Sequence, residues 1–366
     1  MFIFFVNLLL LAVNFGTAIR REEVMILGAE PRATLLTDRD ASPRKCRYAH
    51  PYSMLQARCT NLGLDEVPKN LRTDIQILDF SVNRLRDLQN ETFSSYTSLA
   101  FLYLQDNFIQ TIEEGSFDRL RSLEVIDLTK NGCQDFPKST LALPYLRKLF
   151  LSQNKLNDAS FAPTSLSEES NLEYLELSKN QLRRLPSFGN LPSLKYLNVS
   201  KNLITSVSTE DLARFCSLEV LDLTGNPIKF NETSCDCENF NWWIDIRRIK
   251  MKPEKIDCGS NAKKSRQCTA SSEPEISKFS NETNRLYDSC RNVIETRAAT
   301  AKARSTWILV ASCLGVSLLL LFITLYCIHK KNNRKKARQR LKHQQQLALN
   351  NANTELLNGN VSPEQT

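Results

Sequence analysis

One pattern recurs through the middle of the chain and limits what the chain can fold into. It reads L-x-x-L-x-L-x-x-N-x-L with conservative changes, and its seven copies share an asparagine at the ninth position. These asparagines are Asn83, Asn107, Asn131, Asn154, Asn180, Asn202 and Asn226. They are 24, 24, 23, 26, 22 and 24 residues apart, a period at which each copy forms one structural unit whose apolar faces its neighbours cover.

The spacing within each copy predicts a short strand followed by a turn. Positions 4 and 6 lie two residues apart, so both side chains point into the coil, while positions 3 and 5 point outward. The asparagine side chain both donates and accepts hydrogen bonds, which lets it satisfy buried backbone groups of the turn. We therefore predict an α/β leucine-rich-repeat solenoid with a parallel concave sheet, an irregular convex side and disulfide caps.

The outward positions of these strands carry aromatic and acidic side chains. Exposed aromatic residues are frequent at the energetic centres of protein-binding surfaces. The residues that we expect to bind a protein partner are Phe101, Tyr103, Asp127, Phe150, Tyr174, Glu176 and Tyr196. The alternative is that Tyr and Phe are enriched here because they favour strands. A glycan on Asn198 would stand on the same face and direct the partner toward the second to fifth repeats.

Apolar segments at the two ends place most of the chain outside the cytosol. Residues 1–18 have the apolar core and small residues of a secretory signal peptide, with an uncleaved anchor as the alternative. Residues 307–328 are 22 residues without a charge, long enough to cross a bilayer, and a buried helix of a soluble core is the alternative. Eight Lys or Arg follow, which predicts a single-pass type I plasma-membrane protein with an extracellular N-terminus.

The predicted cytosolic tail, residues 329–366, is too short for an enzyme domain. Its basic start should lie on anionic lipid, and its Gln- and Asn-rich remainder is expected to be disordered or weakly helical. A signal would then need a partner in the membrane or a cytosolic adaptor. Cys327 is a candidate for palmitoylation, and an unmodified membrane cysteine is the alternative.

Charge and histidine content exclude several functions. The net charge is +8, but the tail supplies +6 of it, so the rest of the chain is not a basic nucleic-acid binder. His50 is the one histidine before the membrane segment, which excludes a histidine metal site or a Ser-His-Asp triad in the large N-terminal part. We expect no enzyme activity, no cofactor and no metal.

Nine cysteines lie in the predicted ectodomain, where disulfide bonds are the default. Cys133 fills a core position of its repeat and Cys216 precedes the last repeat, so we expect both to be buried free thiols. Sequons in the same region accept N-glycans in that compartment. They begin at Asn90, Asn198, Asn231 and Asn281.

Cys235-x-Cys237 followed by Asn241-Trp-Trp-Ile resembles the C-terminal cap of extracellular leucine-rich-repeat proteins. In that family the first cap cysteine pairs with the third and the second with the fourth. The resemblance therefore implies the bond Cys235–Cys258 and leaves Cys237 to pair with Cys268 or Cys290. The amino-terminal cap has two cysteines where the family commonly has four, so Cys46–Cys59 is the simplest bond there.

The same cap is rich in basic residues. They are Arg247, Arg248, Lys250, Lys252, Lys255, Lys263, Lys264 and Arg266. Clustered cations of this kind bind sulfated glycans such as heparan sulfate. The alternative is an ordinary solvated face.

These features divide the chain into consecutive segments. They are the signal peptide (1–18), leader segment (19–45), N-terminal cysteine cap (46–74), seven leucine-rich repeats (75–226), C-terminal cysteine cap (227–290), juxtamembrane stalk (291–306), transmembrane helix (307–328) and cytoplasmic tail (329–366). The plan resembles the short-tailed leucine-rich-repeat adhesion and synapse-organising proteins of animals. That resemblance implies a cell-surface receptor for an extracellular or cell-surface protein, with a role in neural or synapse development. The alternatives are an accessory subunit of another receptor and an innate pattern-recognition receptor.

Overall fold

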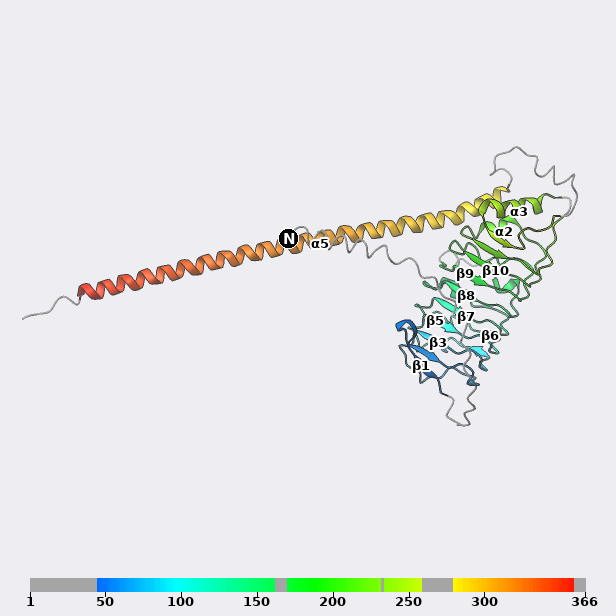
Figure 1. Cartoon of the computed structure of the whole chain (residues 1–366), viewed down its shortest axis with the longest axis horizontal. Coiled ribbons are helices and arrows are strands. Elements are labelled where there is room, and N and C mark those ends of the chain that lie inside the picture. The colour runs from blue at the N-terminus through cyan, green and yellow to red at the C-terminus, as the bar shows by residue number, and fades with distance from the viewer. Residues whose placement is uncertain (1–44, 162–169, 232–233, 259–278, 359–366) are drawn as a thin grey trace, which may run out of the picture. The chain divides into compact units, whose positions relative to one another are not determined.

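The computed structural model describes residues 45–161, 170–231, 234–258 and 279–358 (Figure 1). The predicted signal peptide and most of the leader segment lie outside these residues. Within them, ten short strands form one sheet in the order β1-β2-β3-β5-β7-β8-β9-β10-β11-β12. The strands are β1 (Arg47–Ala49), β2 (Gln56–Arg58), β3 (Ile77–Asp79), β5 (Phe101–Tyr103), β7 (Val125–Asp127), β8 (Lys148–Phe150), β9 (Tyr174–Glu176), β10 (Tyr196–Asn198), β11 (Val220–Asp222) and β12 (Lys250–Lys252).

The predicted parallel solenoid is confirmed. Every neighbouring pair in this sheet is parallel except β1 and β2, which form an antiparallel hairpin in the N-terminal cap. The middle residue of each repeat strand is buried, from Leu78 in β3 to Leu221 in β11, and its two neighbours face outward. The alternation of inward and outward side chains therefore follows the sequence pattern.

An asparagine ladder closes each turn. Asn107 Nδ2 donates to the carbonyl oxygens of Phe80 and Leu104, both at 3.0 Å, and its Oδ1 accepts from the backbone nitrogen of Leu85 at 3.2 Å. The residue before each asparagine has a positive φ, and Gly at position 225 is the one glycine among these seven. Since a left-handed conformation is unfavourable for other residues, the ladder has to compensate for it in each of the six remaining repeats.

The convex side differs along the array. In the first two repeats, β4 (Asp87–Leu88) pairs with β6 (Thr111–Ile112), and Phe93 stacks on Phe117 with ring centroids 6.1 Å apart. Later repeats carry the 3-10 helices η2 (Lys138–Ala142) and η3 (Asp158–Phe161) and the helix α2 (Thr209–Ala213). A further 3-10 turn, η1 (Pro51–Ser53), belongs to the N-terminal cap.

The C-terminal cap is built around α3 (Asp236–Arg247) and the first turns of α5 (Asn281–Asn358). Trp243 is 1% exposed, and its ring meets the edges of Phe279 and Tyr287 at centroid distances of 4.9 and 5.5 Å. The first turns of α5 also contact the repeats, because Asn190 Nδ2 donates to Ser289 Oγ at 3.3 Å. The start of α5 is therefore part of the folded cap.

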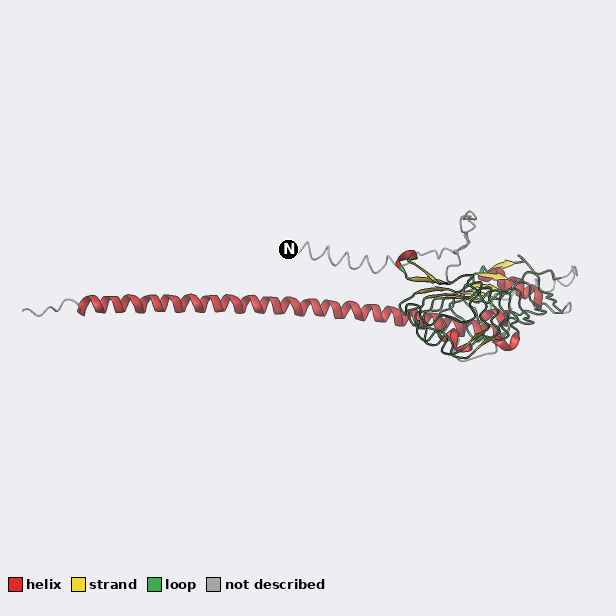
Figure 2. Cartoon of the chain, turned by 90° about the horizontal axis from the view of Figure 1, so that it is seen from below, coloured by secondary structure: helices red, strands yellow, loops and turns green. Residues whose placement is uncertain are grey.

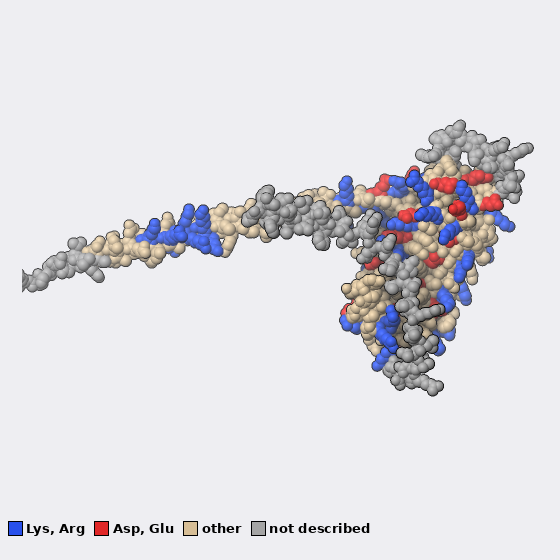
Figure 3. Space-filling view, viewed as in Figure 1, with Lys and Arg blue, Asp and Glu red and all other residues tan. Residues whose placement is uncertain are grey.

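The helix α5 extends beyond the predicted membrane span on both sides. It runs without interruption through the predicted stalk, the predicted span and the tail as far as residue 358, so for these residues the tail follows the helical one of its two predicted alternatives and is not disordered (Figure 2). The tail is rich in Lys, Arg, Gln, Ala and Leu, all of which favour helix. The helix contains a segment apolar and long enough to cross a membrane, with a mean hydropathy of 2.7. Figure 3 shows Lys and Arg gathered on the stretch of α5 that follows it.

The cysteines confirm two predictions and correct three. Cys46 is bonded to Cys59 as predicted, and Cys133 is a buried free thiol as predicted. However, Cys237 is bonded to Cys258, and Cys216 is bonded to Cys290. The predicted bond Cys235–Cys258, the predicted partners of Cys237 and the predicted free thiol of Cys216 are therefore wrong.

Helix packing explains these pairings. Cys237 lies on the buried side of α3, where its Cα is 5.6 Å from that of Cys258, whereas Cys235 precedes the helix. Cys216 closely follows α2, against which the start of α5 packs, and this brings its Cα within 5.9 Å of that of Cys290. Both distances suit a disulfide. Cys235 is also disulfide-bonded, and Cys268 lies outside the described residues.

Candidate functional site

The concave face presents two rows of outward side chains, one from position 3 and one from position 5 of each strand. Parallel pairing sets Tyr174 beside Tyr196 in the first row and Phe150 beside Glu176 in the second. All seven residues predicted to bind a partner lie in these rows and are half-buried. Their placement on the outer side of the sheet agrees with the sequence analysis, and their role in binding stays a prediction.

Three aromatic residues form a continuous aromatic strip across β8, β9 and β10. The ring centroids of Phe150 and Tyr174 are 5.0 Å apart, and those of Tyr174 and Tyr196 are 4.0 Å apart with the ring planes nearly parallel, at 3°. The stacking follows from the register, since adjacent strands are about 4.8 Å apart and the two tyrosines occupy the same position. Sequence spacing placed these residues on one face but did not reveal that their rings stack.

Phe101 and Tyr103 do not join the aromatic strip. They lie on β5, and β7 with Val125 and Asp127 stands between them and Phe150. Burial raises the pKa of Tyr103, and the nearby carboxylates of Asp127 and Asp79 raise it further. The patch predicted from the sequence is therefore two patches separated by a strand.

The acidic residues of position 5 accept hydrogen bonds from the backbone at the strand ends. Asp127 Oδ1 accepts from the backbone nitrogen of Thr129 at 2.8 Å, and Glu176 Oε1 accepts from that of Ser178 at 3.1 Å. Asp222 accepts in the same way from Thr224 at 3.0 Å. This repeated pattern of an acid and then Ser or Thr two residues later was readable in the sequence but was not recognised there.

The surroundings of two of these carboxyl groups disfavour their ionised form. Burial raises the pKa of Asp127, with a further contribution from the charge of Asp79. Burial also raises the pKa of Glu176, partly offset by the hydrogen bonds from Ser178 and Asn198. Among the described residues neither carboxylate forms an ion pair. A cationic group brought by a ligand would therefore be favoured beside them.

Asn198 occupies the position that Asp or Glu fills in other repeats. Its Oδ1 accepts from the backbone nitrogen of Ser200 at 2.9 Å, and its Nδ2 donates to Glu176 Oε2 at 2.9 Å. The sequon at Asn198 thus coincides with the strand-end motif, and the nitrogen that would carry a glycan is hydrogen-bonded. The sequon asparagines Asn90, Asn231 and Asn281 are exposed. Glycosylation at all four remains a prediction.

The described basic residues of the C-terminal cap have different surroundings. Arg247 lies over the rings of Trp243 and Tyr287, with its guanidinium carbon 4.7 and 3.8 Å from their centroids. Lys255 pairs with Asp245 at 3.4 Å. The remaining described members are Arg248, which ends α3, and Lys250 and Lys252 on β12. Lys263, Lys264 and Arg266 lie outside the described residues.

The strand β12 places two of these residues on the sheet. Lys250 and Lys252 pair with Val220 and Asp222 of β11, so both lysines extend the two concave rows at the edge of the sheet. The sequence analysis missed this strand because residues 250–252 carry no repeat pattern. Among the described residues, no group of three or more His, Cys, Asp or Glu is arranged to hold a metal ion.

Comparison with known proteins gives relatives of the repeat region. The leucine rich repeat family model matches residues 73–133, 121–182 and 184–228. Tsukushi from Mus musculus is 33% identical over 184 residues, covering 48% of this chain and 51% of that protein. CD180 antigen from Mus musculus is 31% identical over 210 residues, covering 56% of this chain and 30% of that protein. Podocan from Mus musculus is 28% identical over 207 residues, covering 50% and 34%.

The shared region is a part of each of these proteins. The chain spans about half of the length of Tsukushi and about a third of CD180 antigen and podocan. Among solved structures, the crystal structure of the mouse RP105/MD-1 complex is similar, with 28% identity and a TM-score of 0.39. It covers 48% of this chain and 29% of that chain.

Proposed function

We propose that this chain, a leucine-rich-repeat protein related in sequence to Tsukushi, podocan and CD180, is a membrane-anchored recognition protein. Its work is to bind another protein through the concave face. The apolar segment of α5 anchors it as a single-pass protein, with the repeats outside the cell. Adhesion between cells, including neural cells, is the setting that we propose for this binding.

The aromatic strip is the observation that carries the proposal. Phe150, Tyr174 and Tyr196 lie on the outward side of the sheet, where they are half-buried and their rings contact one another in series. Preference for strands explains why Tyr and Phe occur here, but it does not require three of them to form one contiguous surface. A partner that covers the strip would remove apolar ring surface from water and gain the energy of an aromatic anchor.

The chemistry around the strip defines the partner further. Asp127 and Glu176 flank Phe150 in the second row, and neither forms an ion pair with another described residue. A partner with an apolar or aromatic residue next to Lys or Arg would fill the strip and neutralise these carboxylates. An arginine suits this place best, because it stacks on aromatic rings and binds carboxylates through paired hydrogen bonds.

A role as accessory subunit in the same membrane is the second candidate. Arg297 of α5 donates to the carbonyl oxygen of Ser170, and Cys290 is bonded to Cys216, so α5 is attached to the repeats shortly before its apolar segment. From Arg297 to Trp307 the helix rises roughly 15 Å, at about 1.5 Å per residue. This short connection would hold the repeats near the bilayer, within reach of a neighbouring receptor.

The proposal is tested on cells that display the full chain. We would screen them against a library of soluble ectodomains that includes the chain's own, and retest each binder on Tyr174→Ala/Tyr196→Ala. We expect the double variant to weaken binding by about 30-fold or more, corresponding to a loss of about 2 kcal/mol for removing an aromatic anchor.

Tyr145→Ala is the matched control, because Tyr145 is 62% exposed and lies outside the concave strands. It should leave binding unchanged, and both variants should reach the surface at the wild-type level. Undiminished binding by the double variant would contradict the proposal. Partners recovered by co-purification from singly transfected cells, without an opposing cell, would favour the accessory subunit.

A further inference from the structure

A second surface of the solenoid carries charge that the concave face does not explain. We name it the asparagine rim: positions 8 to 13 of each repeat, which lead from the end of the strand past the ladder asparagine. In the last four repeats it comprises residues 153–158, 179–184, 201–206 and 225–230. These positions hold six cations and one carboxylate, a net charge of +5. The same positions of the first three repeats hold three cations and three carboxylates.

The cations of the asparagine rim are exposed and mostly unpaired. They are Lys155, Lys179, Arg183, Arg184, Lys201 and Lys229. Within the described part of the chain, one of the six is in an ion pair, Arg184 with Asp158 at 3.6 Å. Asp158 is itself engaged, because its Oδ1 accepts from the backbone nitrogens of Arg183 and Arg184 at 2.8 and 3.2 Å. Among the described residues, most of the positive charge of this rim is therefore not paired with a carboxylate.

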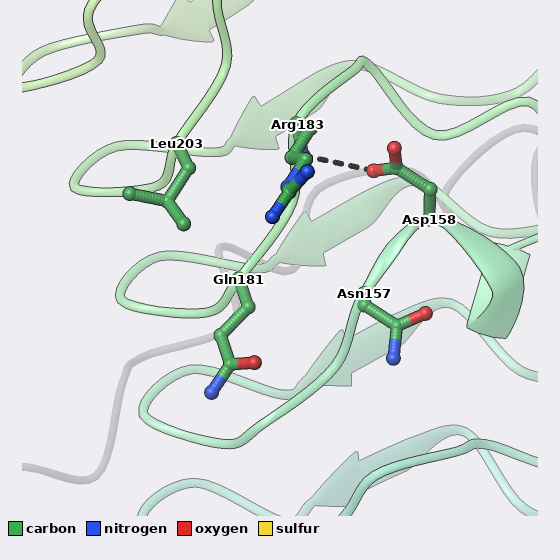
Figure 4. A pocket seen from close by; sticks show the side chains of 5 residues that line it. All are labelled: Asn157, Asp158, Gln181, Arg183 and Leu203. Atoms are coloured by element: carbon green, nitrogen blue, oxygen red, sulfur yellow. Dashed lines mark hydrogen bonds between the residues drawn. The ribbon is translucent and has the colours of Figure 1, made fainter.

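A shallow hollow of about 300 Å³ opens in the middle of this rim. Figure 4 shows its lining from three successive turns: Asn157 and Asp158 on one, Gln181 and Arg183 on the next, and Leu203 on the third. Leu203 is 49% exposed, an apolar side chain in a charged setting. Asn157 Oδ1 accepts from the backbone nitrogen of Ala159, which leaves the amide N–H groups of Asn157 for a ligand.

This combination fits a sugar that bears sulfate groups. Amide side chains such as Asn157 and Gln181 can donate to and accept from hydroxyl groups. Leu203 offers an apolar surface to the face of a sugar ring, and the Arg183 guanidinium matches the oxygens of a sulfate. An acidic peptide would satisfy the cations but would leave this mixed hollow unused.

The periodicity of the rim fits a long linear ligand. Successive repeats are about 4.8 Å apart, and each of the last four supplies a lysine between positions 8 and 12, so Lys155, Lys179, Lys201 and Lys229 give one charge per repeat along the rim. We propose that the asparagine rim of the last four repeats binds a sulfated polysaccharide of the glycosaminoglycan type. The site goes beyond the protein-binding function and uses other residues than the basic group predicted in the C-terminal cap, of which Arg247 and Lys255 are engaged within the cap.

The test uses cells that lack their own glycosaminoglycans and display the full chain, with fluorescent heparin as the probe. Binding is expressed per chain, with an antibody on intact cells measuring the amount at the surface. The rim variant replaces Lys155, Lys179, Lys201 and Lys229 by Gln. Its matched control replaces Arg58, Lys250, Lys252 and Lys255 by Gln, which removes four exposed charges elsewhere.

We expect the rim variant to bind heparin at least about tenfold more weakly, a change of about 1.4 kcal/mol. The control substitutions should reduce the free energy of heparin binding by less than about half of that amount. Desulfated heparin should bind weakly to the wild type, and so should poly-glutamate. Equal losses in the two variants, or none in the rim variant, would overturn the proposal. Poly-glutamate binding as tight as that of heparin would overturn it in favour of an acidic protein.

Discussion

The first three repeats and the last four share a strand and a ladder but differ in what surrounds them. In the first group the convex side contains the regular pair β4–β6 and the stack of Phe93 on Phe117. The last group contains α2 and receives the start of α5 through the bond Cys216–Cys290. It also carries the aromatic strip and the whole net charge of the asparagine rim.

This difference indicates which positions of the repeat carry function. The leucines and asparagines of the pattern are the same in both groups and determine the scaffold. The stacked aromatic strip and the excess of cations at positions 8 to 13 occur in the second group, whereas in the first group Phe101 and Tyr103 do not join the strip and the charges at positions 8 to 13 balance. Recognition is therefore expected to concentrate on the last four repeats, and the first three to serve mainly as scaffold.

The largest expected effect comes from removing one ring from the convex core of each group. Phe117 and Phe188 are buried, at 0% and 3% exposure, and each packs against another phenylalanine. Phe117→Ala and Phe188→Ala should each lower the free energy of unfolding by about 3–5 kcal/mol, because each leaves a cavity. Chemical denaturation measures the loss of stability. A loss below about 1 kcal/mol in either variant would show that the cores of the two groups are not equally well packed.

A smaller effect should separate the two groups. Cys216→Ser/Cys290→Ser removes the bond between α5 and the last repeats and should cost about 2–4 kcal/mol. Hydrogen exchange should rise in the last repeats and in residues 281–297, while the first three repeats stay protected. Cys133→Ala is the control, since Cys133 is a free thiol. If hydrogen exchange rises in all seven repeats, or rises in none of them, the docking of α5 does not distinguish the two groups.

The smallest effect tests a feature that both groups share. Asp127→Asn and Glu176→Gln keep the acceptor for the next backbone N–H, as Asn198 does, but remove a buried charge. Because burial raises both pKa values in the folded state, the ionised carboxylates cost stability at neutral pH. Each variant should therefore be more stable than the wild type at pH 7, by less than about 1 kcal/mol.

The sign of the pH dependence follows from the same shift. As the pH falls through the raised pKa of Asp127 or Glu176, the wild-type carboxyl takes up a proton and its penalty disappears. The advantage of each variant should shrink over that range. Thermal denaturation at neutral and acidic pH measures it. An advantage that does not change with pH would show that burial of the charge is not its cause.

What could be predicted from the sequence was what the repeat determines locally. The strands, the asparagine ladder, the bond Cys46–Cys59 and the buried thiol of Cys133 depend on neighbours within one or two repeats. The bond Cys216–Cys290 joins residues 74 apart that no periodicity relates. The pairing of Cys237 with Cys258 depends on Cys237 lying on the buried side of α3, and this too was not readable from spacing.

The candidate site, too, could be predicted only in part. Positions 3 and 5 placed the aromatic residues on the concave face, but β7 splits them and stacking joins only three of them. The stacked geometry depends on side-chain rotamers, which sequence spacing does not set. The asparagine rim, by contrast, was readable: comparing positions 8 to 13 across the repeats would have shown the excess of cations in the last four.

The most direct measurement is hydrogen exchange of the full chain with and without a captured protein partner. If the last four repeats carry recognition, bound partner should slow exchange in β8, β9 and β10 and in the turns that follow them. The first three repeats should change little. Protection confined to β3 and β5, or to the convex side, with no change in β8 to β10, would contradict the account.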